Sequence, residues 1–421
     1  MNSRELFNLT LNHRDTGKAV IDFGATPVTG IHVLVVERLR KYFGLSDKPV
    51  KVVEPYQMLG EIDAELQQAL GVDIIGLSAR CNMFGIPNEN WREMKMHWGQ
   101  VVLVPGSFNT TTDNEGNLLI HPEGDLSVPP SARMPRTSYF FDAIIRQEPI
   151  DEEKLDVSQN LEEFGQVTDS DLLYWKNQLN SVKDTEKGVI VNFGGTGLGD
   201  IALVPAMNLK HPKGIRDVAE WYMSTVMRTD YVHAIFEKQT EIAIHNLTRY
   251  KEIAGDLAQA IFICGTDFGT QDSTFCSPET FNELYAPYYR KINNWIHKNT
   301  RWSTFKHSCG AVEPFMELFI DAGFDIINPV QINATGMNPV KLKEKYGDRL
   351  VFWGGGVDTQ KILPFGTPAE VEDQVLRECE IFTPGGGFVF NTVHNIQANT
   401  PVENLVAMIN ALRKFNGEKT I

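Results

Sequence analysis

Short apolar runs rich in β-branched and aromatic residues recur along the chain, separated by longer segments with helical spacing. The runs are AVIDF (19–23), DIIGL (73–77), GVIVNF (188–193), AIFIC (260–264), STFKH (303–307), FDIIN (324–328), LVFWG (350–354) and FVFNT (388–392). Runs of this length with little polar alternation are typical of strands that are covered on both faces, as in a parallel sheet. The pattern therefore predicts about eight buried parallel strands.

Between these runs, apolar residues recur with the period of an α-helix. The clearest such segments are residues 31–44, 230–253, 277–298, 367–382 and 400–415. Three of them begin with a Ser-Pro or Thr-Pro pair and an acid in the first turn, as in Ser277-Pro278-Glu279, which combines an N-cap, an early proline and a favourable charge. Alternating strands and helices predict an α/β fold, a (β/α)₈ TIM barrel, formed by residues 1–421 as a single domain.

One region interrupts the alternation. In residues 94–140 the turn sequence DNEGN (113–117) joins two β-like runs, which predicts a β-hairpin insertion. The acidic stretch that follows, residues 148–171, is polar enough to be a solvated connection.

Composition and charge narrow the class of protein. The chain has 421 residues, of which 42% are hydrophobic and 22% charged, and its formal net charge is −15. An acidic protein is a poor partner for nucleic acids or anionic membranes, so we expect neither. The first 20 residues contain no apolar signal region, no stretch is long enough to span a membrane, and the five cysteines show no disulfide spacing. These features predict a cytoplasmic protein with reduced thiols.

The clearest candidate for chemistry is the sequence His307-Ser308-Cys309, at the end of a predicted strand. Residues two apart on a strand share a face, and barrel active sites lie at the carboxyl ends of the strands. Zn²⁺ binds imidazole and thiolate together, and catalytic zinc sites commonly use three protein ligands. His394, just past the last strand, is the best third ligand. The alternative is structural, with Cys309 as a small buried side chain and His307 as a hydrogen-bonded histidine.

A second strand end supplies polar candidates. Asp267 follows the run AIFIC and is expected to act as a fourth ligand, an acid or base, or a turn cap. Gln271, in the same loop, is a candidate for hydrogen bonding to a substrate.

Several segments resemble the uroporphyrinogen decarboxylase superfamily. They are RELFNLTLNHR near the N-terminus, GTDFGTQ with SPETFNELYAPYYRKI, the run from Phe305 to Val375, and the closing TPVENLVAMINAL. The resemblance implies a (β/α)₈ barrel with the active site at its mouth. It also implies one of two chemistries: cofactor-free decarboxylation of uroporphyrinogen, or zinc-dependent methyl transfer between a corrinoid protein and a thiol.

The chain departs from the decarboxylase pattern at two places. The arginine-rich segment that holds substrate carboxylates in that branch corresponds here to IDFGATPVTG (21–30), and Arg80 stands where the essential aspartate would lie. The HxC motif of the methyltransferase branch is present as His307 and Cys309, while His394 takes the position of the third ligand, a cysteine in that branch.

The resemblance therefore favours a corrinoid-linked methyltransferase, with Zn²⁺ bound by His307, Cys309 and His394. A methylcobamide would come from a partner corrinoid protein or as a free substrate, Asp267 and His394 would serve catalysis, and Arg80 would anchor a substrate carboxylate through two hydrogen bonds. The alternative is a metal-free decarboxylase acting on a tetrapyrrole or another carboxylate, with Arg80 and His394 as binding groups. A third reading is a corrinoid-binding accessory protein without turnover. The sequence does not fix the oligomeric state, and a homodimer is one of the assemblies it allows.

Overall fold

The eight apolar runs form one parallel sheet in the computed structural model, which describes residues 1–421. The strand order is β1-β16-β15-β14-β13-β12-β11-β4. From β4 to β16, each strand of this sheet therefore lies beside the one that follows it along the chain. The strands are β1 (Val20–Ile21), β4 (Ile74–Ser78), β11 (Gly188–Asn192), β12 (Ala260–Cys264), β13 (Ser303–His307), β14 (Ile326–Asn328), β15 (Val351–Trp353) and β16 (Phe388–Phe390). The predicted barrel is confirmed, and every predicted run overlaps one of these strands.

The two edge strands, β1 and β4, meet through Asp73. Its backbone N–H donates to the carbonyl of Ile21 at 2.8 Å, and its carboxylate accepts from the Ile21 N–H at 2.9 Å. Close approach is permitted by Gly76 of β4, where a Cβ atom would lie 1.6 Å from the carbonyl oxygen of Ala25. This seam brings the sheet nearly to a closed barrel.

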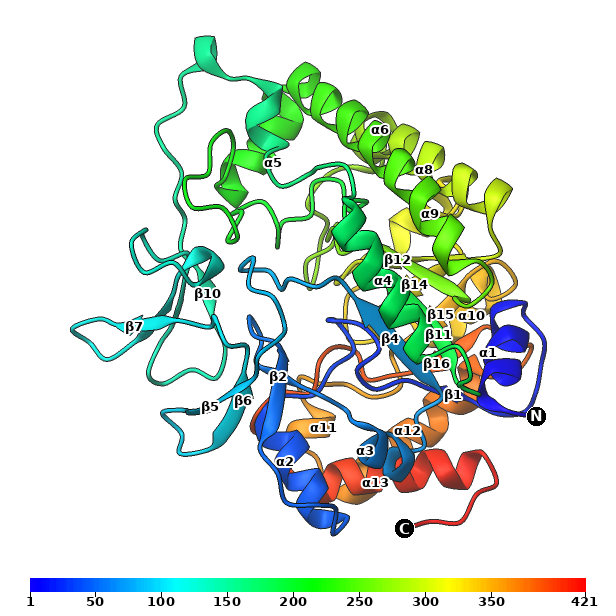
Figure 1. The fold of residues 1–421 in the computed structure, drawn as a ribbon. Coiled ribbons are helices and arrows are strands. Elements are labelled where there is room, and N and C mark those ends of the chain that lie inside the picture. The colour runs from blue at the N-terminus through cyan, green and yellow to red at the C-terminus, as the bar shows by residue number, and fades with distance from the viewer.

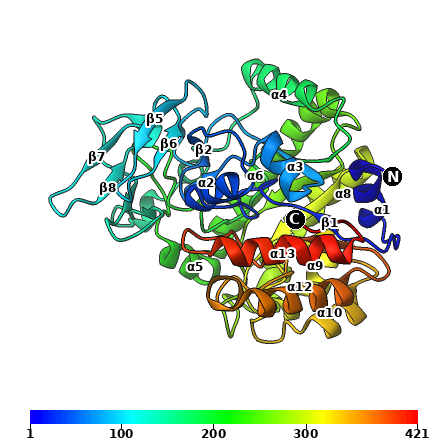
Figure 2. The same cartoon turned by 90° about the horizontal axis from the view of Figure 1, so that it is seen from below.

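Helices surround the barrel (Figures 1 and 2), and α12 and α13 lie side by side in both views. The predicted helical segments are all present, and the one over residues 277–298 consists of α7, a π-helical turn at Phe281–Tyr285 and α8. The helices are α1 (Ser3–Leu11), α2 (Val33–Tyr42), α3 (Ala64–Leu70), α4 (Asp169–Ser181), α5 (Val218–Met227), α6 (Thr229–Ala254), α7 (Pro278–Thr280), α8 (Ala286–Asn299), α9 (Met316–Asp321), α10 (Pro339–Tyr346), α11 (Ile362–Phe365), α12 (Pro368–Phe382) and α13 (Val402–Phe415). None of them combines the length and apolar composition needed to cross a bilayer.

Helix α1 covers the amino ends of the strands. Phe7 on this helix packs against Gly188, the first residue of β11, where a Cβ atom would lie 2.4 Å from the Phe7 ring. The same ring meets Trp353 edge-to-face inside the barrel, with centroids 5.7 Å apart. With that end closed, the opposite end of the barrel is left for chemistry, as in other barrels of this class.

The insertion is larger than the predicted hairpin over residues 94–140. It contributes to two four-stranded sheets, and the turn at residues 113–117 joins β7 to β8 as predicted. One sheet contains β7 (Thr110–Thr112), β8 (Leu118–Ile120), β9 (Ala132–Met134) and β10 (Asp142–Ala143); the other contains β2 (Val50–Glu54), β3 (Leu59–Gly60), β5 (Arg92–Lys95) and β6 (Val101–Val104). The acidic stretch that follows forms two 3₁₀ turns, an exposed one at Glu152–Lys154 and a partly buried one at Val157–Asn160.

Candidate metal centre

The carboxyl ends of β13 and β16 bring three predicted site residues together. One donor atom from each of His307, Cys309 and His394 lies within 4.8 Å of the others. The Cys309 Sγ is 3.3 Å from His307 Nε2, and the two imidazole rings have centroids 5.5 Å apart. We call these three residues the His-Cys-His group. Because all three are soft or borderline donors, they could hold one metal ion.

Local structure explains why His307 faces inward. Phe305, two residues earlier on β13, packs in the barrel interior against Trp353, with ring centroids 5.1 Å apart. Side chains two apart on a strand share a face, so His307 points into the mouth. The chain then turns at Gly310, which has a φ of +89° and sits so close to Gly269 that a Cβ would lie 2.4 Å from its backbone. Glycine at 310 therefore sets the path that leaves Cys309 beside His307.

The next strand supplies a partner for the other nitrogen of His307. Asn328, the last residue of β14, is in register with His307, and its Oδ1 lies 2.7 Å from Nδ1 of that ring. The Asn328 amide nitrogen donates to the carbonyl of Trp353 at 2.9 Å. His307 is thus held by a buried hydrogen-bond chain that runs across three strands.

Burial controls the protonation of the group. It lowers the pKa of His307 to about 4 and that of His394 to about 4, in the second case with help from the neighbouring His307. Burial also raises the pKa of the Cys309 thiol well above its ordinary value, and the nearby Asp267 carboxylate adds to that effect. At neutral pH the group without metal therefore holds two neutral imidazoles and a thiol.

Asp267 lies at the edge of the group, after β12. Its Oδ1 accepts the backbone N–H of Cys309 at 2.7 Å and is 3.8 Å from His307 Nε2. Burial raises the pKa of Asp267, while the hydrogen bond from Cys309 acts in the opposite direction. Its second neighbour is Asp200, a buried acid whose pKa burial and Asp267 together raise to about 6. Asp200 accepts the backbone N–H groups of Ala202 and Gly265, each at 3.1 Å.

The side chains of the two predicted substrate-binding residues, Arg80 and Gln271, form hydrogen bonds with other groups of the protein. Arg80 follows β4 and is 44% exposed, and its guanidinium contacts the carboxylate of Glu89 at 2.7 Å. Gln271 donates to the carbonyl of Asn333 at 2.6 Å and accepts from the Gln331 amide at 2.9 Å. Gln271 therefore links neighbouring loops of the mouth, and Arg80 pairs within the loop that joins β4 to β5. Their roles toward a substrate stay predictions.

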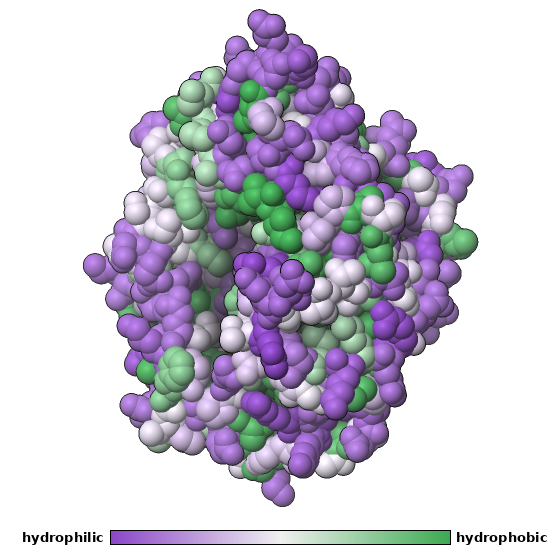
Figure 3. Space-filling model, turned by 90° about the vertical axis from the view of Figure 1, so that its left-hand side faces the viewer, coloured by the Kyte–Doolittle hydropathy of each residue, from purple (hydrophilic) through white to green (hydrophobic).

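The surface of the molecule has a hollow with hydrophobic side chains beside it. In Figure 3 the face on the side of the small sheets is hollowed, and hydrophobic side chains gather beside the hollow. Helix α5 exposes Met223, Val226 and Met227, and Tyr222 on the same helix stacks on Phe275 with ring centroids 4.8 Å apart.

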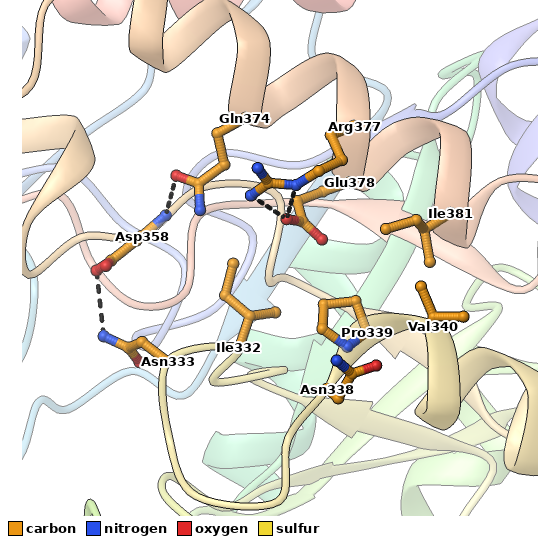
Figure 4. A pocket seen from close by; sticks show the side chains of 10 residues that line it. All are labelled: Ile332, Asn333, Asn338, Pro339, Val340, Asp358, Gln374, Arg377, Glu378 and Ile381. Atoms are coloured by element: carbon orange, nitrogen blue, oxygen red, sulfur yellow. Dashed lines mark hydrogen bonds and ion pairs between the residues drawn. The ribbon is translucent and has the colours of Figure 1, made fainter.

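A separate pocket of about 310 Å³ lies between α10 and α12 (Figure 4). None of its lining residues belongs to the His-Cys-His group. Arg377 and Glu378 on its wall pair with each other at 2.9 Å, and Gln374 accepts the backbone N–H of Asp358 at 3.1 Å. This pocket is therefore distinct from the candidate metal centre.

Two residues of the site were not predicted. Asn328 is the polar residue at the end of the apolar run FDIIN. Its place at the end of a buried strand, next to the strand of His307, is the sequence feature that could have indicated a site residue. Asp200 closes the glycine-rich run NFGGTGLGD, which in isolation is more typical of a tight loop. Neither contact can be assigned before the strand order and register are known.

Comparison with known proteins places the chain in a family. A structure described as a methyltransferase from Methanosarcina mazei superimposes with a TM-score of 0.55 at 15% identity, covering 99% of both chains, which establishes the shared fold. A GH113 β-1,4-mannanase aligns over 59% of this chain and 80% of its own with 12% identity and a TM-score of 0.29, too low to carry an argument. A search of curated proteins gave no match.

The sequence model of uroporphyrinogen decarboxylase (URO-D) matches residues 205–415, which is half of the chain. That range contains Asp267 and the whole His-Cys-His group. The resemblance seen in the sequence motifs is thereby confirmed, and the chain belongs to the uroporphyrinogen decarboxylase family.

Proposed function

We propose that the protein is a zinc-dependent, corrinoid-linked methyltransferase. The observation that carries this proposal is the convergence of His307, Cys309 and His394 at the open end of the barrel, with donor atoms within 4.8 Å of one another. Three protein donors with one position left open is the arrangement that catalytic zinc sites use. The fold shared with a methyltransferase agrees with the proposal.

The donor set suits zinc better than a hard cation. Two imidazoles and one thiolate match the borderline-soft character of Zn²⁺, whereas Mg²⁺ and Ca²⁺ prefer oxygen ligands. The imidazoles are already neutral at pH 7, so only the Cys309 proton has to leave when the ion binds. Asp267, whose Oδ1 accepts the backbone N–H of Cys309, would serve as a fourth ligand or as the group that receives a proton.

The residues then have separate roles in methyl transfer. Bound Zn²⁺ would supply the positive charge that lowers the pKa of an acceptor thiol. The sulfur of that thiol would attack the methyl carbon of the methylcobamide substrate, forming an S–C bond while the Co–C bond breaks and leaves its electron pair on cobalt. Asp267 is positioned to take up the thiol proton, since burial raises its pKa above that of an ordinary carboxyl. The methylcobamide would be presented by a corrinoid protein or as a free molecule.

Arg80 would bind a carboxylate of the small-molecule substrate. Its guanidinium already pairs with Glu89, so a substrate would have to compete with that carboxylate. This arrangement is one reason to rank the metal-free decarboxylase second, because that reaction depends on Arg80 and His394 to hold the carboxylates without help from an ion.

The first experiment is the metal content of protein purified without chelator. We expect nearly one zinc per chain in the wild type and in Cys81→Ala, which removes an exposed thiol outside the group, and almost none in Cys309→Ala. Demethylation of methylcobalamin, followed by its absorption spectrum with a panel of thiols, then tests the reaction. Absence of metal from the wild type would refute the zinc mechanism and favour the decarboxylase, and zinc with cobamide binding but no turnover would favour the accessory protein.

A further inference from the structure

Asn328 occupies a buried position between His307 and Trp353. Only 1% of Asn328 is exposed, and both ends of its side-chain amide are engaged, at 2.7 Å with His307 Nδ1 and at 2.9 Å with the Trp353 carbonyl. A backbone carbonyl can only accept a hydrogen bond, so the NH₂ group of Asn328 must face Trp353. The amide oxygen consequently faces His307, and this orientation follows from the chemistry of its neighbours.

The orientation determines which nitrogen of His307 carries the hydrogen. An amide oxygen accepts, so the Nδ1 atom of His307 must donate and must therefore be protonated. In a neutral imidazole the other nitrogen, Nε2, then has a free electron pair. That atom lies 3.3 Å from Cys309 Sγ, on the side where the His-Cys-His group converges.

We propose that Asn328 is a positioning residue that holds His307 in the Nδ1–H tautomer and thereby presents Nε2 as a ready metal ligand. As a statement about metal affinity, this inference rests on the proposed function. As a statement about the tautomer, it stands without any metal. A hydrogen bond to the second nitrogen of a metal-bound histidine fixes both the tautomer and the orientation of the ring.

Asparagine suits both neighbours where similar residues do not. Aspartate would accept from His307 but could not donate to the Trp353 carbonyl, and leucine would do neither. Gly354, which has a φ of +96°, keeps room for the amide, because a Cβ there would lie 3.3 Å from the Asn328 nitrogen. His394, by contrast, makes no side-chain hydrogen bond to another protein group, so of the two imidazoles only His307 is fixed in this way.

The tautomer can be measured directly by NMR on metal-free protein labelled with ¹⁵N-histidine, at pH 7.5. The chain has 10 histidines, and the His307 signals are those lost in His307→Gln. We expect a protonated Nδ1 and an unprotonated Nε2 in the wild type. In Asn328→Leu the protonated fraction of Nδ1 should fall, and in Asn328→Asp, which keeps the acceptor, it should remain high. A wild-type His307 with hydrogen on Nε2 would overturn the inference, whether or not the protein binds zinc and whether or not the Asn328 variants fold.

Zinc affinity, measured by competition with a chromophoric chelator, provides the second readout. Asn328→Leu should weaken binding by about 10- to 100-fold, with Asn328→Asp closer to the wild type. The matched control is Asn404→Leu, which removes another buried asparagine bonded to backbone carbonyls, those of Leu363 and Gly366, away from the mouth. An unchanged affinity and tautomer in Asn328→Leu would refute the positioning role. A wild type that binds no zinc would refute the proposed function alone.

Discussion

Asp22 is an acid enclosed in the barrel, just after β1. Its carboxylate accepts the indole N–H of Trp353 at 2.9 Å and the backbone N–H of Ala25 at 3.0 Å. Burial nevertheless raises the pKa of Asp22 to about 7, because the hydrogen bonds to the carboxylate do not replace the water that it loses. Between the unfolded and folded pKa values, folding takes up a proton at this residue.

This proton uptake gives a signed prediction for stability. The contribution of Asp22 is fully present below its unfolded pKa and is lost as the pH rises through 7, so the wild type should lose stability relative to Asp22→Asn between about pH 4 and pH 7. The change in the difference is at most about 4 kcal/mol, at about 1.4 kcal/mol per tenfold change in proton affinity. Urea unfolding at several pH values measures it. Asp184→Asn, at a carboxylate that is 89% exposed, is the control, and a pH-independent difference for Asp22→Asn would contradict the prediction.

Lys306 is a second buried charge, on the opposite face of β13 from His307. Its ammonium donates to the carbonyls of Thr266 and His307 at 2.7 and 2.9 Å and lies 4.8 Å from the ring centroid of Phe268. These bonds join the ends of β12 and β13, which lead to Asp267 and Cys309. The Lys306 ammonium therefore helps to fix the backbone that leads into the loops of the candidate site.

Replacing Lys306 by methionine keeps the apolar stem but leaves two buried carbonyls without a donor. We expect a loss of about 2–4 kcal/mol in the free energy of unfolding, since a hydrogen bond to a charged group contributes about 1.5–3 kcal/mol. Lys291→Met is the matched control, because that lysine pairs with Glu237 at the surface and should cost less than about 1 kcal/mol. Equal losses in the two variants, measured by urea unfolding, would show that Lys306 has no special structural role.

At the scale of elements, the barrel depends on how closely β1 and β4 approach. A methyl group at Gly76 would lie 1.6 Å from the Ala25 carbonyl oxygen, a backbone atom that cannot move without opening the seam. Gly76→Ala should therefore destabilise the protein by at least about 1–3 kcal/mol. Gly165→Ala, where a Cβ has no neighbour within 4 Å and φ is not positive, is the control for the substitution itself. Thermal unfolding compares them, and a Gly76→Ala transition at the wild-type temperature would contradict the close packing.

The barrel strands could be predicted because each is a compact apolar run covered on both faces. AIFIC and STFKH coincide with β12 and β13 at both ends. The small sheets gave a weaker signal. Strand β5 reads REMK and is largely exposed, and β3 and β10 have two residues each, so neither burial nor alternation distinguishes them from loops. The sheet that contains β3 and β5 also depends on the pairing of β2 with β6, which are far apart in the sequence.

The candidate site likewise has a part that could be predicted from the sequence and a part that could not. The two-residue spacing of His307 and Cys309 indicated a shared face, and barrel geometry predicted that His394 would lie near them. The hydrogen bond from His307 to Asn328 required the register of β13 and β14, and the pairing of Arg80 with Glu89 required the path of the loop between β4 and β5. Spacing along one strand is visible in a sequence, whereas contacts between strands follow only from the closed fold.

For the whole molecule, a bound ion would connect parts of the barrel that are far apart in the chain. His307 and Cys309 follow β13, and His394 follows β16, three strands further around the sheet. A site that combines all three ligands exists only in the folded state, so the free energy of ion binding adds to the free energy of unfolding. In this respect the proposed metal would act as a cross-link at the mouth of the barrel.

The last prediction follows from that linkage. Adding Zn²⁺ to metal-free protein should raise the melting temperature, with a stabilisation of about 2.7 kcal/mol when free zinc is about 100 times its dissociation constant. Cys309→Ser should lose most of the shift, because a neutral hydroxyl replaces the thiolate ligand, whereas Cys81→Ser should keep it. Mg²⁺ should have no comparable effect, since it prefers oxygen ligands. A shift of equal size in Cys309→Ser would place the stabilising zinc elsewhere on the protein, because the His-Cys-His group cannot hold an ion equally well after losing one of its three donors.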